Sequence, residues 1–184
     1  MRLDSCRIGL LTTDGFDAPA LSGLEDEFRA EGAEVRVIGI KSGPIRGWAD
    51  GNWADFRHAD MVLDEVSLTD FDGIVLVPGL LAVDVLRTER FVINFVSRFA
   101  ARGRVIAAIG HAPLILMEAG LARGKRVTGA RSIRTDLRNA GGLVREAGTV
   151  GDGKLVTAED ACGLANFVAA VSDSLSSEAK PEAA

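Results

Sequence analysis

A histidine at the end of a predicted buried strand is the side chain of this sequence best placed to do chemistry. His111 follows the apolar run Val105–Ile109 and Gly110. Five apolar residues without alternation are typical of a parallel strand that is covered on both faces. The turn after such a strand lies at the carboxyl edge of the sheet, where open α/β folds bind ligands and a sharp turn can present a nucleophile. Because Gly110 at the apex has no side chain, the pattern locates a site more clearly than it identifies a reaction.

Two roles are open to His111 on the sequence alone. It could act as a general base on a water molecule held over Gly110. It could instead be a structural histidine that bonds to the backbone or to a partner subunit. Asp14 and Asp17, in the loop after the first predicted strand, are the carboxylates that could orient the imidazole, although both also suit turn and cap positions.

The other nucleophilic and metal-binding residue types are few. Cys6 opens the first strand at the wrong end of the sheet, which favours a structural role. Cys162 lies near the start of the last predicted helix, where the helix dipole could lower a thiol pKa, so it is either a substitute nucleophile or a small inert residue. His58 has no metal-ligand spacing to His111 or to either cysteine. We therefore expect no metal site and no cofactor.

The elements that must position these residues alternate between strands and helices. A strand–helix–strand start implies a right-handed crossover and a parallel sheet. The predicted strands span residues 7–12, 35–39, 71–77, 105–109, 125–128, 143–146 and 154–157. The predicted helices span residues 19–32, 83–86, 89–101, 113–119, 132–141 and 160–175.

Two of these helices carry specific signals. An apolar stripe on the helix at 89–101 is predicted to consist of Phe91, Phe95, Val96 and Phe99. The helix at 132–141 is predicted to begin at an N-cap serine, Ser132, and to stop at a glycine.

The stretch 41–58 differs in character and is interpreted as a long insertion without periodicity. Such an insertion in a compact domain is usually functional or an interface. It holds both tryptophans, Trp48 and Trp53, together with Phe56. The tryptophans either pack the insertion against the core or form a contact surface.

Composition sets the class of protein. The 184 residues, 47% of them hydrophobic, can bury a core in one domain, predicted at 1–175, with a disordered tail at 176–184. A net charge of −5 argues against nucleic acid as a partner. No apolar run reaches the length of a membrane span, and Met1–Asp4 has no signal-peptide pattern. Two cysteines suit a reducing compartment, so we expect a cytoplasmic protein.

The order of landmarks resembles the ThiJ/PfpI superfamily, and more narrowly its PfpI intracellular protease and general stress protein branch. The segments that carry the resemblance are residues 13–16, 47–48, 53–55, 77–79, 108–113 and 132–141. It covers nearly the whole chain. The resemblance implies an α/β, flavodoxin-like three-layer sandwich with a mostly parallel central sheet, as in class I glutamine amidotransferase domains. It also implies a homo-oligomer, a dimer or a hexamer, with the stretch 41–58 close to the subunit interface.

The same resemblance implies that two functional side chains have been replaced. Members of the branch carry a nucleophilic cysteine before the elbow histidine, and that position is Gly110 here. A glutamate that hydrogen-bonds the cysteine sulfur corresponds to Ala20, and a Pro-Gly-Gly motif of the oxyanion pocket reads Pro78-Gly79-Leu80. We expect the pocket to be lined by Asp14, Gly15, Asp17, Gly79, Leu80, Ala112 and Arg131.

These replacements predict a stress-associated PfpI-like protein that is a catalytically silent ligand-binding or interaction oligomer, with a small molecule as its ligand. One alternative is a hydrolase or lyase that acts on a small carbonyl or amide substrate through His111 and an activated water. A second alternative is an interaction module that works through the Trp48–Trp53 insertion.

Overall fold

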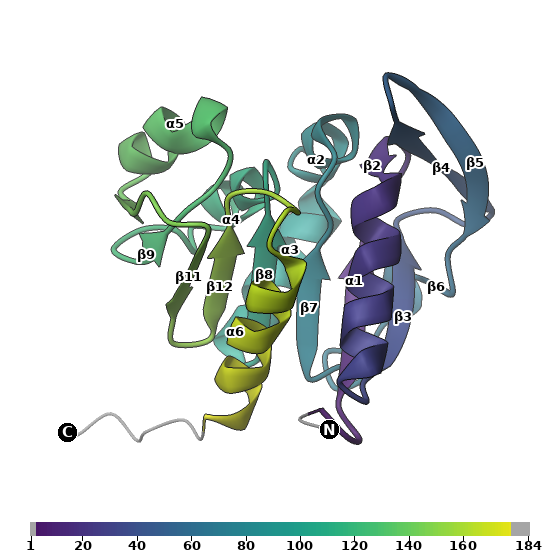
Figure 1. Ribbon diagram of the computed structural model, residues 1–184, viewed down its shortest axis with the longest axis horizontal. Coiled ribbons are helices and arrows are strands. Elements are labelled where there is room, and N and C mark those ends of the chain that lie inside the picture. The colour runs from purple at the N-terminus through teal and green to yellow at the C-terminus, as the bar shows by residue number, and fades with distance from the viewer. Residues whose placement is uncertain (1–2, 178–184) are drawn as a thin grey trace.

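A seven-stranded sheet forms the centre of the fold (Figure 1). In the computed structural model, which describes residues 3–177, the strand order is β11-β12-β8-β7-β1-β3-β6. Every neighbouring pair is parallel except β11 and β12. The strands are β1 (Arg7–Leu11), β3 (Glu34–Gly39), β6 (Met61–Val62), β7 (Gly73–Leu76), β8 (Val105–Ile109), β11 (Thr149–Asp152) and β12 (Leu155–Ala158).

Helices cover both faces of this sheet and complete the predicted three-layer sandwich. Figure 1 shows α1 and α6 in front of the strands and α3 behind them. The alternation of side chains along β1 explains the two cores: Ile8 and Leu10 pack into one cluster with α1 and α6, whereas Leu11 belongs to the cluster on the other face. The helices are α1 (Ala18–Ala30), α2 (Leu80–Leu86), α3 (Arg90–Ala101), α4 (Pro113–Glu118), α5 (Arg134–Asn139) and α6 (Leu164–Ser176). No helix among the described residues combines the length and apolarity that a membrane crossing needs.

The stretch 41–58 is a β-hairpin, so its interpretation as an insertion without regular structure is wrong. Strands β4 (Pro44–Ala49) and β5 (Asn52–His58) are antiparallel, and β2 (Phe16–Asp17) pairs in parallel with β4. Asp50 and Gly51 connect the two strands with φ angles of 50° and 76°. Two consecutive positive φ angles define the two-residue turn that matches strand twist, and Asp-Gly is its preferred sequence. That dipeptide was the signal that could have predicted the hairpin.

The stripe of α3 also differs from its prediction. Its buried residues are Val92, Phe95, Val96 and Phe99, while Phe91 is 42% exposed. The buried positions follow the i, i+3, i+4, i+7 spacing of a single helix face, and Phe91 lies beside that face.

The C-terminal part holds two further corrections, to a strand and to the start of a helix. Strand β11 was not predicted, because its four residues include a glycine and an aspartate, which are uncommon in strands. Helix α6 begins at Leu164 and not at residue 160, since Asp160–Gly163 forms a turn before it. The short strands β9 (Arg126–Val127) and β10 (Leu143–Val144) form a separate parallel pair. Of the tail predicted at 176–184, residues 178–184 lie outside the described residues.

Candidate functional site

Three loops meet at the carboxyl edge of the central sheet, at the upper end in Figure 1. Strand β3 lies on one side of β1 and strand β7 on the other, so the strand order reverses between β1 and β7. Open α/β sheets bind ligands at such a point. The loops that follow β1, β7 and β8 contain Gly15, Gly79 and Gly110, and all three have positive φ angles.

The loops after β1 and β7 are packed against each other through glycine. A Cβ atom on Gly79 would lie 2.6 Å from the carbonyl oxygen of Gly15 and 2.6 Å from Cα of Phe16. The backbone N–H of Asp17 donates a 2.9 Å hydrogen bond to the carbonyl of Pro78. Only glycine at position 79 therefore allows this contact between the loops.

A cavity of about 340 Å³ opens beside this contact. Its lining includes four of the residues expected around the pocket, together with a tryptophan of the hairpin and a second leucine of α2: Gly15, Asp17, Trp48, Gly79, Leu80 and Leu81. Asp14, Ala112 and Arg131 are not part of this lining. Ala112 is fully buried and Arg131 is exposed.

The two aspartates of the loop after β1 have structural partners. Asp14 accepts hydrogen bonds from the Lys41 ammonium and, at 2.8 Å, from the Arg46 backbone N–H. Burial alone would raise the pKa of Asp14, but these hydrogen bonds hold it below its usual value. Asp17 is the N-cap of α1 and accepts from the Ala20 N–H at 3.0 Å. Neither aspartate orients His111, so the cap and turn roles are the ones observed.

The elbow after β8 is built around Gly110, whose φ angle is 65°. Its N–H donates to the carbonyl of Ala158 at 3.0 Å, and its carbonyl accepts from the Ala130 N–H at 2.8 Å. A Cβ atom on Gly110 would meet only Cβ of Pro78, at 3.5 Å, which is ordinary van der Waals contact. The elbow thus has the backbone geometry of a turn that presents a side chain, with space in place of that side chain.

His111 bonds to Ser132, and this contact corrects the prediction for that serine. The distance from His111 Nε2 to Ser132 Oγ is 2.9 Å. Residues Arg131–Ile133 form a 3₁₀ turn, and α5 begins only at Arg134, so Ser132 is not its N-cap. The hydrogen bond from the Ile133 N–H to the Ala130 carbonyl tightens the turn that precedes the helix. Burial lowers the pKa of His111 below its usual value.

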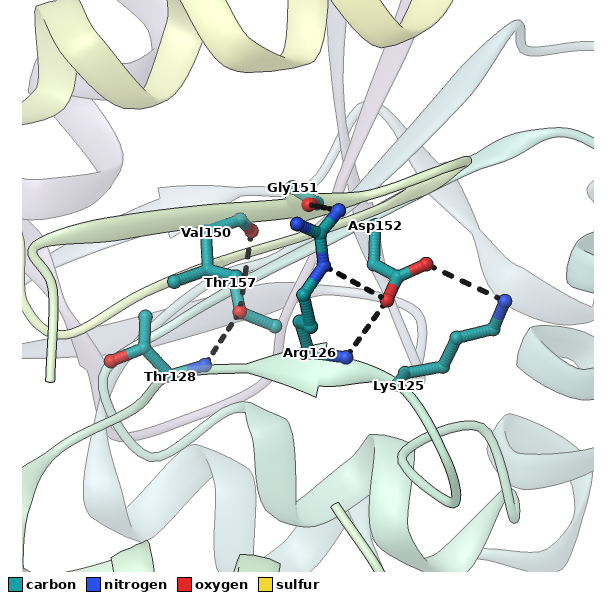
Figure 2. Close-up of polar contacts among 7 residues, drawn as sticks. All are labelled: Lys125, Arg126, Thr128, Val150, Gly151, Asp152 and Thr157. Carbon is teal, nitrogen blue, oxygen red and sulfur yellow. Dashed lines mark hydrogen bonds and ion pairs between the residues drawn. The ribbon is translucent and has the colours of Figure 1, made fainter. Parts of the chain in front are cut away.

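A polar network supports the segment that leads to Ser132 (Figure 2). The Thr128 N–H donates to Oγ1 of Thr157 in β12 at 2.9 Å. Asp152 of β11 accepts from the Arg126 N–H at 2.9 Å and forms ion pairs with Lys125 and Arg126. The Arg126 N–H, with these cations, lowers the pKa of Asp152 against the opposing effect of its burial. These contacts hold β9 next to the edge of the central sheet.

A second cavity, of about 510 Å³, extends from the start of α1 to the turn before α6. Ala20 and Cys162 both line it, as do Asp17, Trp48 and Asp160. Cys162 precedes the helix it was expected to open, and the charge of Asp160 and a hydrogen bond to it raise the pKa of the thiol. The dipole-lowered pKa considered for Cys162 is therefore contradicted.

The remaining candidates are distributed over the molecule. Burial is the main cause that raises the pKa of the Cys6 thiol. His58 lies at the end of β5. Within residues 3–177, His, Cys, Asp and Glu side chains form no cluster of three or more that could hold a metal ion.

Comparisons with known proteins agree with this architecture. The model of the DJ-1/PfpI family matches residues 6–174. The chain is 31% identical over 151 residues to a deglycase of Thermococcus kodakarensis, an alignment that covers 82% of this chain and 88% of that protein. It is 30% identical over 135 residues to general stress protein 18 of Bacillus subtilis, with 73% and 77% covered.

A solved structure extends the comparison to three dimensions. It is a two-domain protein of Anabaena variabilis that contains DJ-1/ThiJ/PfpI-like and ferritin-like domains. The two structures superpose with a TM-score of 0.85 at 27% sequence identity. The match covers 93% of this chain and 48% of that one, so this chain spans about half of its length.

Proposed function

Because the chain belongs to the DJ-1/PfpI family, we propose that it is a member without cysteine chemistry at its elbow, which binds a small molecule within an oligomer. The observation that carries this proposal is that the residue at the turn after β8 is a glycine, Gly110, which has no side chain. Gly110 has the positive φ angle of the elbow, and no side chain stands between it and Pro78. A thiolate nucleophile needs a sulfur atom at such a point.

Ala20, at the position of the sulfur-binding glutamate, supports the loss of a matched pair of side chains. Ala20, which the resemblance aligns with the sulfur-binding glutamate, lines the larger cavity with a methyl group. A carboxyl group there has no thiolate to stabilise once the cysteine is gone. The two existing thiols both have raised pKa values, which makes them poor nucleophiles at neutral pH.

The cavities support retention of a binding role. Trp48 lines both cavities, so the hairpin contributes apolar surface to each of them. Ligand pockets combine such apolar surface with a few polar groups, and the carboxylates of Asp17 and Asp160 supply the latter. The stress-associated role follows from general stress protein 18 as a relative.

A hydrolase or lyase that uses His111 and water remains the second candidate. It is favoured by the lowered pKa of His111, which keeps the imidazole neutral and able to accept a proton at pH 7. It is weakened by the absence of an orienting carboxylate, because no Asp or Glu of residues 3–177 bonds to the ring.

Deglycase, glyoxalase and peptidase assays, run with and without iodoacetamide, test the proposal. The Thermococcus kodakarensis relative serves as the positive control for the deglycase assay. We expect no turnover that alkylation abolishes. Thiol-dependent turnover that disappears in Cys162→Ala would overturn the proposal and identify Cys162 as the nucleophile. Turnover that resists iodoacetamide and persists in Ser132→Ala, but is lost in His111→Asn, would establish the second candidate.

A further inference from the structure

Ser132 and His111 have the arrangement of a nucleophile and its base. Their Oγ and Nε2 atoms are 2.9 Å apart, inside the range found for activated hydroxyl groups. Ser132 is exposed and His111 is half-buried, so solvent and small molecules reach the hydroxyl while the protein holds the ring. The Ser132 hydroxyl is not used as a helix cap, because α5 begins two residues later without a side-chain cap.

The backbone fixes the pair across 21 residues of sequence. The Ala130 N–H donates to the carbonyl of Gly110, which binds the turn that carries Ser132 to the elbow that carries His111. Gly129 permits this approach, since a Cβ atom there would lie 3.2 Å from the Gly110 carbonyl oxygen. Ile133, next to Ser132, is buried in the core and anchors the turn from the other side.

The turn that carries His111 has space for one added carbon atom at Gly110. A Cβ atom on Gly110 would have one neighbour, Pro78, and that neighbour is at van der Waals distance.

We propose that Ser132 is an acyl-accepting nucleophile with His111 as its general base, and that the pair hydrolyses small esters with good leaving groups. The class of substrate follows from how strongly His111 can activate the Ser132 hydroxyl. No carboxylate among residues 3–177 supports His111, and a base without such support serves esters better than amides, whose leaving groups are poor.

The reaction balances without a further reagent except water. In the tautomer with its proton on Nδ1, Nε2 of His111 accepts the Ser132 hydroxyl proton while Oγ forms a bond to the carbonyl carbon. The ester C–O bond then breaks, and the leaving alcohol takes the proton from Nε2. A water molecule then attacks the acyl carbon and gives a proton to Nε2. The bond between the acyl carbon and Oγ breaks, and Oγ takes that proton from Nε2, which releases the carboxylic acid and restores the Ser132 hydroxyl and the neutral imidazole. The lowered pKa of His111 keeps the resting base neutral.

This inference goes beyond the proposed function and does not rest on it. A reactive serine is compatible with the loss of thiol chemistry, and the two hypotheses are tested with different reagents. Failure of the serine to react leaves the iodoacetamide result unchanged.

The test treats the full chain with a fluorophosphonate, which forms a stable Ser–phosphorus bond as fluoride leaves, and locates the adduct by mass spectrometry. We expect the adduct on Ser132 and none on Ser132→Ala. His111→Asn and His111→Gln should each slow labelling about 100-fold, which is the usual contribution of a general base. Ser67→Ala is the matched control, because Ser67 is exposed and bonds to Thr69 instead of a histidine. It should label like the unaltered chain.

A second measurement follows the hydrolysis of p-nitrophenyl acetate. Release of p-nitrophenol should depend on both Ser132 and His111, and an acetyl group should accumulate on the peptide that contains Ser132. Circular dichroism verifies that each variant is folded, and a failed fold in one histidine variant leaves the other to decide. Absence of any adduct on Ser132 overturns the inference. Labelling of Ser132 that is equally fast in a folded histidine variant also overturns it, since the serine would then react without its base.

Discussion

Replacing a glycine that has a positive φ angle can destabilise a protein by very different amounts, depending on which atoms surround the glycine. Gly110 and Gly153 have φ angles of 65° and 64°, and neither would place a Cβ atom closer than 3.5 Å to a neighbour. Gly79 has a φ angle of 134° and would place its Cβ atom inside the backbone of the loop after β1. The site therefore contains one glycine needed for its backbone angle and one needed for contact between two loops.

Alanine substitutions separate these two needs. We expect Gly110→Ala and its control Gly153→Ala each to lower the free energy of unfolding by about 1–2 kcal/mol, the cost of a left-handed alanine. Gly79→Ala should cost at least about 3 kcal/mol, because backbone strain and overpacking add. Urea unfolding measures all three. An equal cost at positions 79 and 153 would mean that the loops separate easily and that the cavity beside them is not rigid.

The reactivity of Cys162 is controlled by its neighbour Asp160. The negative charge of Asp160, which also accepts a 2.8 Å hydrogen bond from the Cys162 N–H, raises the pKa of the exposed thiol. Asp160→Asn removes the charge, so the thiol pKa falls and the thiolate fraction at pH 7.5 rises. We expect iodoacetamide to alkylate Cys162 faster in this variant at pH 7.5. The two rates should converge at a pH above both pKa values, where the Cys162 thiol is ionised in the variant and in the unaltered chain alike. Asp84→Asn, on α2, is the control and should have no effect, because Asp84 is not among the groups that shift the pKa of this thiol. A similar acceleration there would show that overall charge is responsible.

The β4–β5 hairpin is the element that borders both cavities, and a buried carboxylate fastens it to α1. Glu25 of α1 has a side chain only 5% exposed, and its Oε1 atom accepts from Arg57 of β5 at 2.6 Å and from Arg29 at 2.8 Å. On the same hairpin, the Arg46 guanidinium lies over the rings of Trp53 and Phe56. Truncation of Arg57 at its contact with α1 should therefore loosen the attachment of the β4–β5 hairpin, which borders both cavities.

Arg57→Ala tests this attachment. We expect it to lower the free energy of unfolding by about 1.5–3 kcal/mol, as for other hydrogen bonds to a charged group. Arg36→Ala is the control, because its ion pair with Glu34 is half-exposed at both ends and is worth about 0–1 kcal/mol. Hydrogen exchange should also accelerate at the β4 and β5 amides in Arg57→Ala. Unchanged exchange in the hairpin would show that its attachment lies elsewhere.

The molecule as a whole gathers exposed apolar side chains at one end. Trp48 borders the same cavity as Leu80 and Leu81 of α2, and all three are at least 36% exposed. Trp53 and Phe56 continue this surface along β5, with exposed fractions of 45% and 66%. Clusters of this kind mark contacts between proteins more often than isolated apolar residues do. We therefore propose a two-fold dimer with the hairpin near its interface.

Sedimentation velocity at micromolar concentration measures this assembly. We expect at least a dimer of the 19.4 kDa chain, and a shift toward monomer when Trp48→Ala and Trp53→Ala are combined. Leu143→Ala, an exposed apolar truncation on β10, is the control and should leave the assembly intact. A monomer at every concentration would contradict the assembly. A dimer that both tryptophan substitutions leave undisturbed would place the interface on another surface.

Much of the fold follows from the sequence because the signals for it are local. The buried strands at the centre of the sheet and the helix that starts near Pro19 are each determined by a few consecutive side chains. The periods of 2.0 and 3.6 residues belong to single elements and need no knowledge of neighbours. A parallel sheet and the location of the elbow at Gly110 could be predicted on that basis. The flavodoxin-like arrangement was implied only by the resemblance to the ThiJ/PfpI superfamily. The hairpin was predictable too, because Asp50-Gly51 is the preferred sequence of its two-residue turn.

The tertiary structure decided which side chains meet. Ser132 has the sequence pattern of an N-cap, yet it bonds to His111, because the Ala130–Gly110 hydrogen bond brings the two loops together. Asp14 bonds to Lys41 rather than to the histidine, because the loop before β4 lies next to the loop after β1. These partners are separated by 21 and 27 residues, and their meeting depends on strand order and on how closely glycines let the loops approach. The local sequence determines which interactions each side chain is able to make. The packing of loops that are distant in sequence determines which of those interactions it makes.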